Sequence, residues 1–263
     1  MNKITFCKTT FDNLENKINL YISTLTGVIE DYWEEHFFNA AAYKIYYDNK
    51  TVGFFTLFNN EKITSFWVEH AHICKSQSIF KTILDKFGVK TAYVTTCDEL
   101  FLSLCLDFHI KIELQAYFFD GTLTQPVRTA EYGRECLIEI EPTEIYAVNK
   151  ETDNFFEEFT QDSLERGDTI IYRFSYEDET LGYGVIVPVK LMPQNWACGM
   201  ITLPNYRKKG VGRSIQLHLG DICKENDKTP VSGCWYQNPL SKCTIESAGR
   251  YSKTRLLDVY FCD

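Results

Sequence analysis

The sequence predicts an α/β protein (layered α+β) made of two similar domains, each a mixed central sheet flanked by helices. Its 263 residues are enough for one to two domains of roughly 150 residues each. Segments 48–54 and 177–183 both contain a polar turn followed by Thr, an apolar residue, Gly and an aromatic residue. After each copy, strand-like stretches alternate with helix-like stretches, which is typical of layered α/β folds.

In the first half, aromatic and alternating residues at 43–47 and 51–54 surround a polar turn and predict a strand–turn–strand hairpin. Periodicity after this hairpin predicts further elements in a fixed order. They are a strand at 63–70, a helix at 78–87, a strand at 91–96, a helix at 98–108 and a strand at 110–119.

The second half repeats this order, and Thr180 follows Thr51 by 129 residues, about half the chain. The second hairpin covers 171–176 and the strand that begins at Thr180. The later elements are a strand at 197–203, a helix at 212–225, a strand at 231–235, a short helix at 239–247 and a final strand at 255–262. Gly121, Pro126 and Gly133 punctuate a polar stretch between the halves. We therefore expect domains at 1–125 and 126–263.

The formal net charge is −9, which disfavours non-specific binding to nucleic acid or to an anionic membrane. Residues 1–7 lack the apolar run of a signal peptide, and no stretch approaches the ~20 apolar residues of a membrane span. The ten Cys form no C-x-x-C pair, which is typical of free thiols in a reducing compartment. These features predict a cytoplasmic protein without nucleic-acid or membrane partners.

The segment with the clearest chemistry is 203–214, Leu-Pro-Asn-Tyr-Arg-Lys-Lys-Gly-Val-Gly-Arg-Ser. It has four cations between Arg207 and Arg213, and no acid occurs from Leu203 to Gly220. The segment lies between a predicted strand and a predicted helix, and its glycines allow tight turns that expose backbone N–H groups. Such donors, together with the positive end of a helix dipole, form a site for an anion such as a diphosphate.

Two common phosphate-binding motifs do not fit this segment. A P-loop requires a Gly five residues before a Gly-Lys pair, and no Lys follows Gly212. A dinucleotide fingerprint requires a third Gly, but Ile215 stands there. The pattern that remains is Arg-x-x-Gly-x-Gly, supplied by Arg207, Gly210 and Gly212 and followed by a helix with an apolar stripe.

This pattern resembles the acetyl-CoA loop of the GNAT superfamily of N-acetyltransferases. The resemblance extends to the preceding Thr202-Leu203-Pro204-Asn205-Tyr206-Arg207 and to a second signature of Asn238, Ser241 and Gly249. It implies that acetyl-CoA is the co-substrate, with its diphosphate on the loop amides and its pantetheine arm on the preceding strand. The residues implied to bind it are Ile201, Thr202, Leu203, Arg207, Lys208, Lys209, Gly210, Val211, Gly212, Arg213, Ser214, Asn238 and Ser241.

The chain also departs from the GNAT pattern. Ile245 stands where many members have a Tyr that protonates the leaving thiolate, and Arg250 replaces the usual Phe after Gly249. No acid occurs in 195–200, where many members carry a general base. Tyr251 is a nearby hydroxyl and our candidate general acid, although a packing role for this ring is the simpler interpretation.

The first half resembles the same fold without its cofactor loop, because 69–78 contains neither Gly nor Arg. We interpret it as a degenerate copy. The aromatic and acidic cluster at 32–38 is either a cover for a cationic acceptor or core packing. His70, His72 and Cys74 would share one face of a strand and could bind zinc, although a polar strand edge fits better and we predict no metal. Cys105 and His109 fit a helix end better than a nucleophilic pair.

The resemblance thus implies an acyl-CoA-dependent N-acyltransferase that transfers acetyl from acetyl-CoA to a primary amine of a small molecule or peptide. A non-catalytic acyl-CoA-binding protein is the main alternative, because the usual acid and base are missing. A third possibility is a nucleotide enzyme that uses the loop for ATP. The sequence leaves open a monomer or a homodimer.

Overall fold

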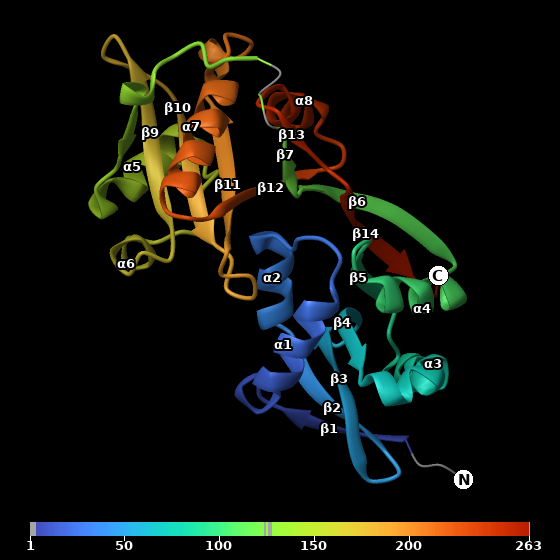
Figure 1. Cartoon of the computed structure of the whole chain (residues 1–263). Coiled ribbons are helices and arrows are strands. Elements are labelled where there is room, and N and C mark those ends of the chain that lie inside the picture. Colours follow the sequence, from blue (N-terminus) through green and yellow to red (C-terminus); the bar gives the residue numbers. More distant parts are fainter. Residues whose placement is uncertain (1–3, 124, 126–127, 263) are drawn as a thin grey trace. The chain divides into compact units, whose positions relative to one another are not determined.

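The computed structural model describes residues 4–123, 125 and 128–262, which group into two compact units (Figure 1). Unit 1 comprises residues 1–117 together with 254–263, and unit 2 comprises residues 118–253. Each unit is a mixed sheet with helices on its faces, as the sequence predicts.

Unit 1 contains the following helices and strands in chain order. They are β1 (Ile4–Thr9), η1 (Asp12–Leu14), α1 (Glu15–Thr24), α2 (Asp31–Phe38), β2 (Ala41–Tyr47), β3 (Lys50–Phe58), β4 (Lys62–Val68), η2 (His70–Lys75), α3 (Ser76–Phe87), β5 (Thr91–Thr95), α4 (Glu99–Phe108), β6 (Lys111–Phe119, whose last two residues belong to unit 2) and β14 (Thr254–Tyr260). The strand order is β1-β2-β3-β4-β5-β14-β6. Strands β4 and β5 are parallel, whereas β1 to β4 form an antiparallel meander.

Unit 2 contains the remaining elements. They are β7 (Gly121–Thr122), η3 (Arg134–Cys136), β8 (Leu137–Glu139), η4 (Pro142–Glu144), α5 (Ile145–Glu151), α6 (Gln161–Glu165), β9 (Ile170–Tyr176), β10 (Glu179–Pro188), β11 (Asn195–Thr202), η5 (Pro204–Tyr206), α7 (Val211–Glu225), β12 (Thr229–Trp235), α8 (Pro239–Ser247) and β13 (Arg250–Tyr251). The strand order is β12-β11-β10-β9-β8, with β11 and β12 parallel and the other pairs antiparallel.

The internal repeat is a real structural repeat. Asp48 and Asn49 have φ of 48° and 67°, and Glu177 and Asp178 have φ of 49° and 64°. Two consecutive positive φ angles are the requirement of a type I′ turn, whose twist matches that of the flanking strands. The two hairpins, β2–β3 and β9–β10, are therefore closed by the same turn.

A steric restriction explains why each hairpin repeat contains a glycine. A Cβ on Gly53 would lie 2.1 Å from the carbonyl oxygen of Trp67, and a Cβ on Gly182 would lie 2.4 Å from that of Ile201. Each glycine lies beside an irregularity in its hairpin, where the neighbouring strand approaches its backbone closely. Any other residue at these positions would push the next strand away.

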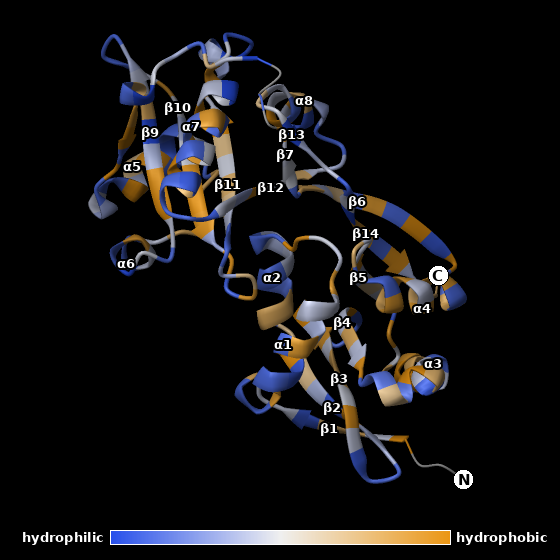
Figure 2. Cartoon of the chain, in the orientation of Figure 1, coloured by the Kyte–Doolittle hydropathy of each residue, from blue (hydrophilic) through white to orange (hydrophobic). Residues whose placement is uncertain are grey.

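The cores cover the sheet faces as the periodicity predicts. In unit 2, α7 buries Ile215, Leu219 and Ile222 against β9 to β11. A second cluster on the α5 side includes Phe156 and Tyr183. In Figure 2, β6 alternates hydrophilic and hydrophobic residues along its length, as expected for a strand with two unlike faces.

The predicted division of the chain differs from these units in two respects, of which the first is that unit 1 ends at residue 117 rather than 125. The prediction assigns the final strand to the second domain, but β14 pairs with β5 from Leu256↔Thr95 to Tyr260↔Thr91 and belongs to unit 1. The sheet of unit 1 is thus completed by β14, from the C-terminal part of the chain. The sequence pattern identifies a strand there but carries no information about its long-range pairing partner.

Candidate functional site

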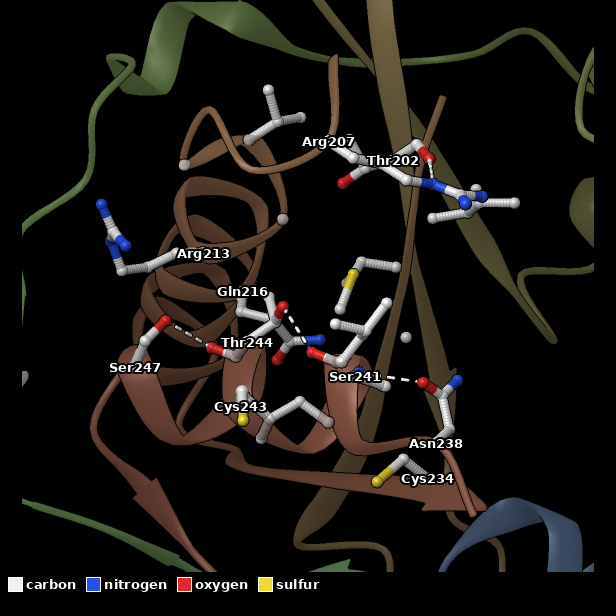
Figure 3. A pocket seen from close by; sticks show the side chains of 18 of the residues that line it. Thr202, Arg207, Arg213, Gln216, Cys234, Asn238, Ser241, Cys243, Thr244 and Ser247 are labelled. Atoms are coloured by element: carbon white, nitrogen blue, oxygen red, sulfur yellow. Dashed lines mark hydrogen bonds between the residues drawn. The ribbon is translucent and has the colours of Figure 1, made fainter. Parts of the chain in front are cut away.

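Unit 2 contains a cavity of about 750 Å³ that is lined by β11, β12, the first turns of α7, and α8 (Figure 3). No carboxylate or imidazole is among its lining residues in the described part of the chain, whereas cations line its loop end. Most of the predicted cofactor-binding residues line this cavity. They are Ile201, Thr202, Arg207, Lys208, Gly210, Val211, Gly212, Arg213, Asn238 and Ser241.

The cavity begins where two parallel strands separate. Strands β11 and β12 pair between 195–197 and 229–231. At the next position the carbonyl oxygen of Cys198 accepts hydrogen bonds from Ser232 Oγ at 2.8 Å and from Gln216 Nε2 at 3.1 Å. Beyond this point β11 and β12 share no register pair among the described residues, so the backbone edge of β11 that faces β12 is available to a ligand.

The glycine loop forms the other end of the cavity. Lys208 and Gly210 have φ of 63° and 79°, and Gly210 is the N-cap of α7 without a side-chain cap. The first N–H groups of a helix have no partner within it, and they carry the positive end of the helix dipole. Upstream, Tyr206 donates a hydrogen bond to Glu179 Oε2 at 2.7 Å, which ties the loop to β10.

The cations of the loop have different environments. Arg207 Nε donates to the carbonyl oxygen of Thr202 at 3.3 Å, and Lys209 lies 5.3 Å from the ring centre of Tyr206. Arg213 is only 8 % exposed, and in Figure 3 its side chain lies on the side of α7 away from Thr202. The charge of Arg207 and Lys208 is therefore the more directly available to an anion in the cavity.

Arg213 and Ser214 instead bind residues 129–132, which follow the predicted boundary between the two domains. Arg213 donates to Thr129 O at 2.9 Å and to Glu131 Oε2 at 2.6 Å. Ser214 Oγ accepts from the N–H groups of Glu131 and Tyr132 at 2.9 and 3.3 Å. Ser214 is fully buried and does not line the cavity, and neither do Leu203 and Lys209. The side chains of Arg213 and Ser214 thus support the first turn of α7.

Asn238 has a structural role at the opposite wall. Its Oδ1 accepts a hydrogen bond from Ser241 N at 3.0 Å and caps the N-terminus of α8 (Figure 3). Asp98 caps α4 in the same way, accepting from Phe101 N at 3.1 Å. The two units therefore share this cap, and in unit 2 the capping residue also lines the cavity.

The structure does not bring Tyr251 to the cavity. Tyr251 is 38 % exposed on β13, does not line the cavity, and lies so close to Gly121 that a Cβ there would overlap its ring. Its position fits the packing interpretation rather than the general acid that we considered. Ile245 does line the cavity and is 2 % exposed, so an apolar side chain occupies the place of the usual Tyr.

Several lining residues were missed by the sequence analysis. Gln216 lies one turn after Gly212 on α7, and Thr244 lies one turn after Ser241 on α8. Helical spacing from the motif residues could have found both. Arg128, Phe155 and Cys234 come from segments without any sequence signal for the cavity, and Cys243 lies on α8 beside Ser241 without being part of the signature.

The weaker sequence hypotheses find little support. His70, His72 and Cys74 lie on the 3₁₀ helix η2 rather than on a strand, and no group of metal ligands occurs among the described residues. Cys105 is fully buried, and burial raises its pKa, which opposes the thiolate that a nucleophile needs. In the 32–38 cluster, Trp33 and Phe37 are core residues of α2.

Comparison with known proteins agrees with the fold. Residues 10–122 match a family model described as an acetyltransferase (GNAT) domain. A search of curated proteins finds no match. No helix in the described ranges is sufficiently long and apolar to cross a membrane.

Several solved structures share the fold over nearly the whole chain. A GNAT-family acetyltransferase from Colwellia psychrerythraea is 16 % identical, with a TM-score of 0.85 and 99 % and 100 % of the two chains covered. A tandem GNAT protein from the clavulanic acid biosynthesis pathway is 10 % identical, with a TM-score of 0.56 and 98 % of each chain covered. A GCN5-related N-acetyltransferase from Sphaerobacter thermophilus is 12 % identical, with a TM-score of 0.59 and coverage of 97 % and 95 %.

These matches confirm the resemblance that the sequence motifs indicate. Residues 10–122 match the GNAT acetyltransferase model, and the chain has the fold of a tandem GNAT protein over nearly its whole length. The family model matches the first half, whose resemblance rested only on the order of its elements, whereas the sequence motifs lie in the second half.

Proposed function

We propose that this protein is an acyl-CoA-dependent N-acyltransferase that uses acetyl-CoA and modifies a primary amine of a small molecule or peptide. The observation that carries the proposal is the cavity of unit 2, where the loop of Arg207 and Gly210, the edge of β11 beyond Cys198 and the N-terminus of α8 line one space. The GNAT fold supports acyl transfer as the type of reaction.

The lining residues fit acetyl-CoA, which would supply an activated acetyl thioester. The N–H groups at the start of α7 would hold its diphosphate, with Arg207 and Lys208 adding positive charge. Backbone groups on the edge of β11 beyond Cys198 would hydrogen-bond the amides of its arm. Met200, Ile201 and Leu240 would cover the apolar part of the arm and exclude water.

Holding the amine against the thioester would supply a large part of the rate of this reaction. Proximity and orientation contribute up to about 7–11 kcal/mol in favourable intramolecular cases. The amine enters as its free base, and the backbone N–H groups of the β11 edge near Met200 would polarise the acetyl carbonyl.

Calorimetry with acetyl-CoA and CoA tests the shared part of the proposal. We expect both to bind, and Arg207→Ala and Gly210→Asp each to weaken binding by about tenfold or more, because one removes a cation and the other adds an anion at the diphosphate site. Unchanged affinity in both variants would contradict the loop assignment. ATP that binds and is not displaced by CoA would favour a nucleotide enzyme instead.

A thiol-release assay with polyamines, aminoglycosides, amino acids and peptides then tests turnover. A non-catalytic acyl-CoA-binding protein is the second candidate, and it is favoured by Ile245 and by the lack of a carboxylate among the described lining residues. Tight binding of acetyl-CoA without thiol release for any amine would support that candidate.

A further inference from the structure

A buried arginine lies behind the point where β11 and β12 separate. Arg250 is 4 % exposed. Its Nη1 donates to Ser232 Oγ at 2.8 Å and to Val231 O at 3.3 Å, and its Nη2 donates to Gln216 O at 3.2 Å. It therefore links β13 to β12 and α7.

These partners connect Arg250 to the cavity wall. Ser232 Oγ and Gln216 Nε2 both donate to the carbonyl oxygen of Cys198, and both Gln216 and Cys198 line the cavity. Arg250 itself does not line the cavity. Ser232 and Gln216 thus separate Arg250 from the end of the cavity at which β11 and β12 come together.

The charge of Arg250 is not compensated by an acid. All its partners are carbonyl or hydroxyl oxygens, and it pairs with no carboxylate among the residues that the structure describes. A buried charge without a counter-ion is costly, and a neutral side chain would avoid that cost. The helix also makes room for it, because a Cβ on Gly220 would lie 3.2 Å from Arg250 Nη2.

The course of the cavity along β11 places the charge of Arg250 near the thioester end of a bound acetyl-CoA. The glycine loop follows Thr202, and the strands close at Cys198, four residues or roughly 13 Å earlier along β11. A diphosphate at the loop with its arm along β11 would therefore place its sulfur toward Cys198 and Gln216. This step rests on the proposed function.

We propose that Arg250 is a positioning residue that stabilises the thiolate of coenzyme A as the leaving group, acting through the buried Ser232 and the lining residues Gln216 and Cys198. In the GNAT pattern a Tyr at the position of Ile245 protonates the leaving thiolate. Here the positive charge of Arg250 would stabilise that thiolate instead. A positive charge in a site of low dielectric lowers the free energy of an anion formed beside it.

The reaction balances without an enzymatic acid. The lone pair of the free amine forms a C–N bond to the acetyl carbon, and the C–S bond breaks with its electron pair on sulfur. The attacking nitrogen, which is positively charged once the C–N bond has formed, loses a proton to water to give the amide, and the thiolate of CoA leaves beside the cavity wall in front of Arg250. No oxidant or reductant takes part.

The charge of Arg250 also acts on the pKa of a nearby thiol, that of Cys223 on α7. The Cys198 thiol raises the pKa of Cys223, burial adds to the rise, and the charge of Arg250 acts in the opposite direction. The titratable or charged groups that line the cavity are three thiols, one phenol and four cations. They are Cys198, Cys234, Cys243, Tyr206, Arg128, Arg207, Lys208 and Arg213.

The test compares CoA with desulfo-CoA, in which hydrogen replaces the thiol, by calorimetry from pH 7 to 9.5. Titration of protein groups affects both ligands, so the ratio of their dissociation constants reports the thiol alone. If Arg250 stabilises the thiolate, the bound thiol has a lowered pKa, and CoA gains affinity over desulfo-CoA as pH rises. A lowering of one unit gives about a tenfold gain.

Two variants separate charge from structure. In Arg250→Gln the gain with pH should vanish, and in Arg250→Lys it should be largely kept. Arg166→Gln is the matched control, because Arg166 is an exposed arginine paired with Asp168 on another loop. A purely structural Arg250 would weaken both ligands equally in Arg250→Gln and leave the pH dependence of their ratio unchanged.

The outcomes distinguish the two proposals. If neither ligand binds to the wild-type protein, the proposed function is wrong. If both bind and the wild-type ratio stays flat with pH, only the role of Arg250 is overturned. The wild-type measurement decides this point even if Arg250→Gln does not fold.

Discussion

The phenol of Tyr21 donates a 2.8 Å hydrogen bond to Asp98 Oδ2 inside unit 1, while Asp98 Oδ1 caps α4 through Phe101 N. Asp98 is 4 % exposed, and burial raises its pKa to about 6, although both hydrogen bonds act to lower it. In unit 2 the corresponding capping residue is Asn238, which is neutral. The two units thus cap the corresponding helices, α4 and α8, with side chains of different charge.

Asp98→Asn should stabilise the protein at neutral pH. The pKa of Asp98 in the folded state lies above its value near 4 in the unfolded state. The protonated side chain therefore stabilises the fold fully below pH 4, and this stabilisation is lost as pH rises through about 6. Asn caps as well as Asp, and it avoids burying a charge. We expect a gain on the order of 2 kcal/mol at pH 7.5 that disappears near pH 4.

Urea unfolding between pH 4 and 8 measures this difference. Asp85→Asn is the control, because Asp85 is an exposed residue of α3 that pairs with Lys81. A difference between wild type and Asp98→Asn that does not grow from pH 4 to pH 7 would show that the pKa of Asp98 is not held near 6.

Gly210→Ala should weaken CoA binding more than it weakens the fold. Gly210 has φ of 79°, and a Cβ there would lie 2.7 Å from Glu131 Cγ. Gly88→Ala is matched to it, because Gly88 lies in unit 1 with φ of 60°, and a Cβ there would meet no atom within 4 Å. Each change should cost about 1 kcal/mol of stability.

Calorimetry on both variants distinguishes an effect of backbone strain from an effect on the CoA site. CoA affinity should fall by about tenfold in Gly210→Ala, because the N–H groups at the start of α7 move. It should be unchanged in Gly88→Ala. An equal loss of affinity in the two variants would mean that the loop is not the diphosphate site.

Glu131→Gln should strengthen CoA binding. The Glu131 carboxylate pairs with Arg213 at 2.6 Å and lies beside Gly210, so its negative charge opposes an anion at the start of α7. Removing that charge should raise affinity by about two- to fivefold at low salt, with a smaller effect at high salt.

Asp221→Asn serves as the control for this charge. Asp221 is exposed on the same helix, more than two turns further along, where it pairs with Lys224. Its removal should leave CoA affinity nearly unchanged. A gain of equal size in both variants would indicate a general effect of net charge.

Leu257→Ala should destabilise unit 1, although Leu257 lies near the end of the chain. Leu257 pairs with Val94 on β5 and belongs to the core under α3 and α4. Its loss should cost about 2–5 kcal/mol. Hydrogen exchange should accelerate first in β2 to β5.

Leu219→Ala is the counterpart in unit 2, where Leu219 packs in the core beneath α7. Its loss should accelerate exchange first in β9 to β11. Faster exchange of β9 to β11 in Leu257→Ala, with β2 to β5 unaffected, would contradict the assignment of β14 to unit 1.

Local sequence alone was sufficient for much of this protein. The two hairpins follow from a polar pair between alternating strands, and helices α3, α4, α7 and α8 and the strands around them follow from apolar periodicity. Helices α1, α2, α5 and α6 and the short strands were not predicted. The loop at Arg207 to Gly212 was identifiable because positive φ, exposed N–H groups and positive charge depend on residues adjacent in the chain.

Tertiary structure decided everything that depends on distant partners. Only folding places β14 beside β5, turns Arg213 toward Glu131, leaves Tyr251 outside the cavity and buries Arg250 behind it. Strand pairing and side-chain burial are set by which surfaces meet, and residues far apart in sequence leave no local pattern that records those meetings.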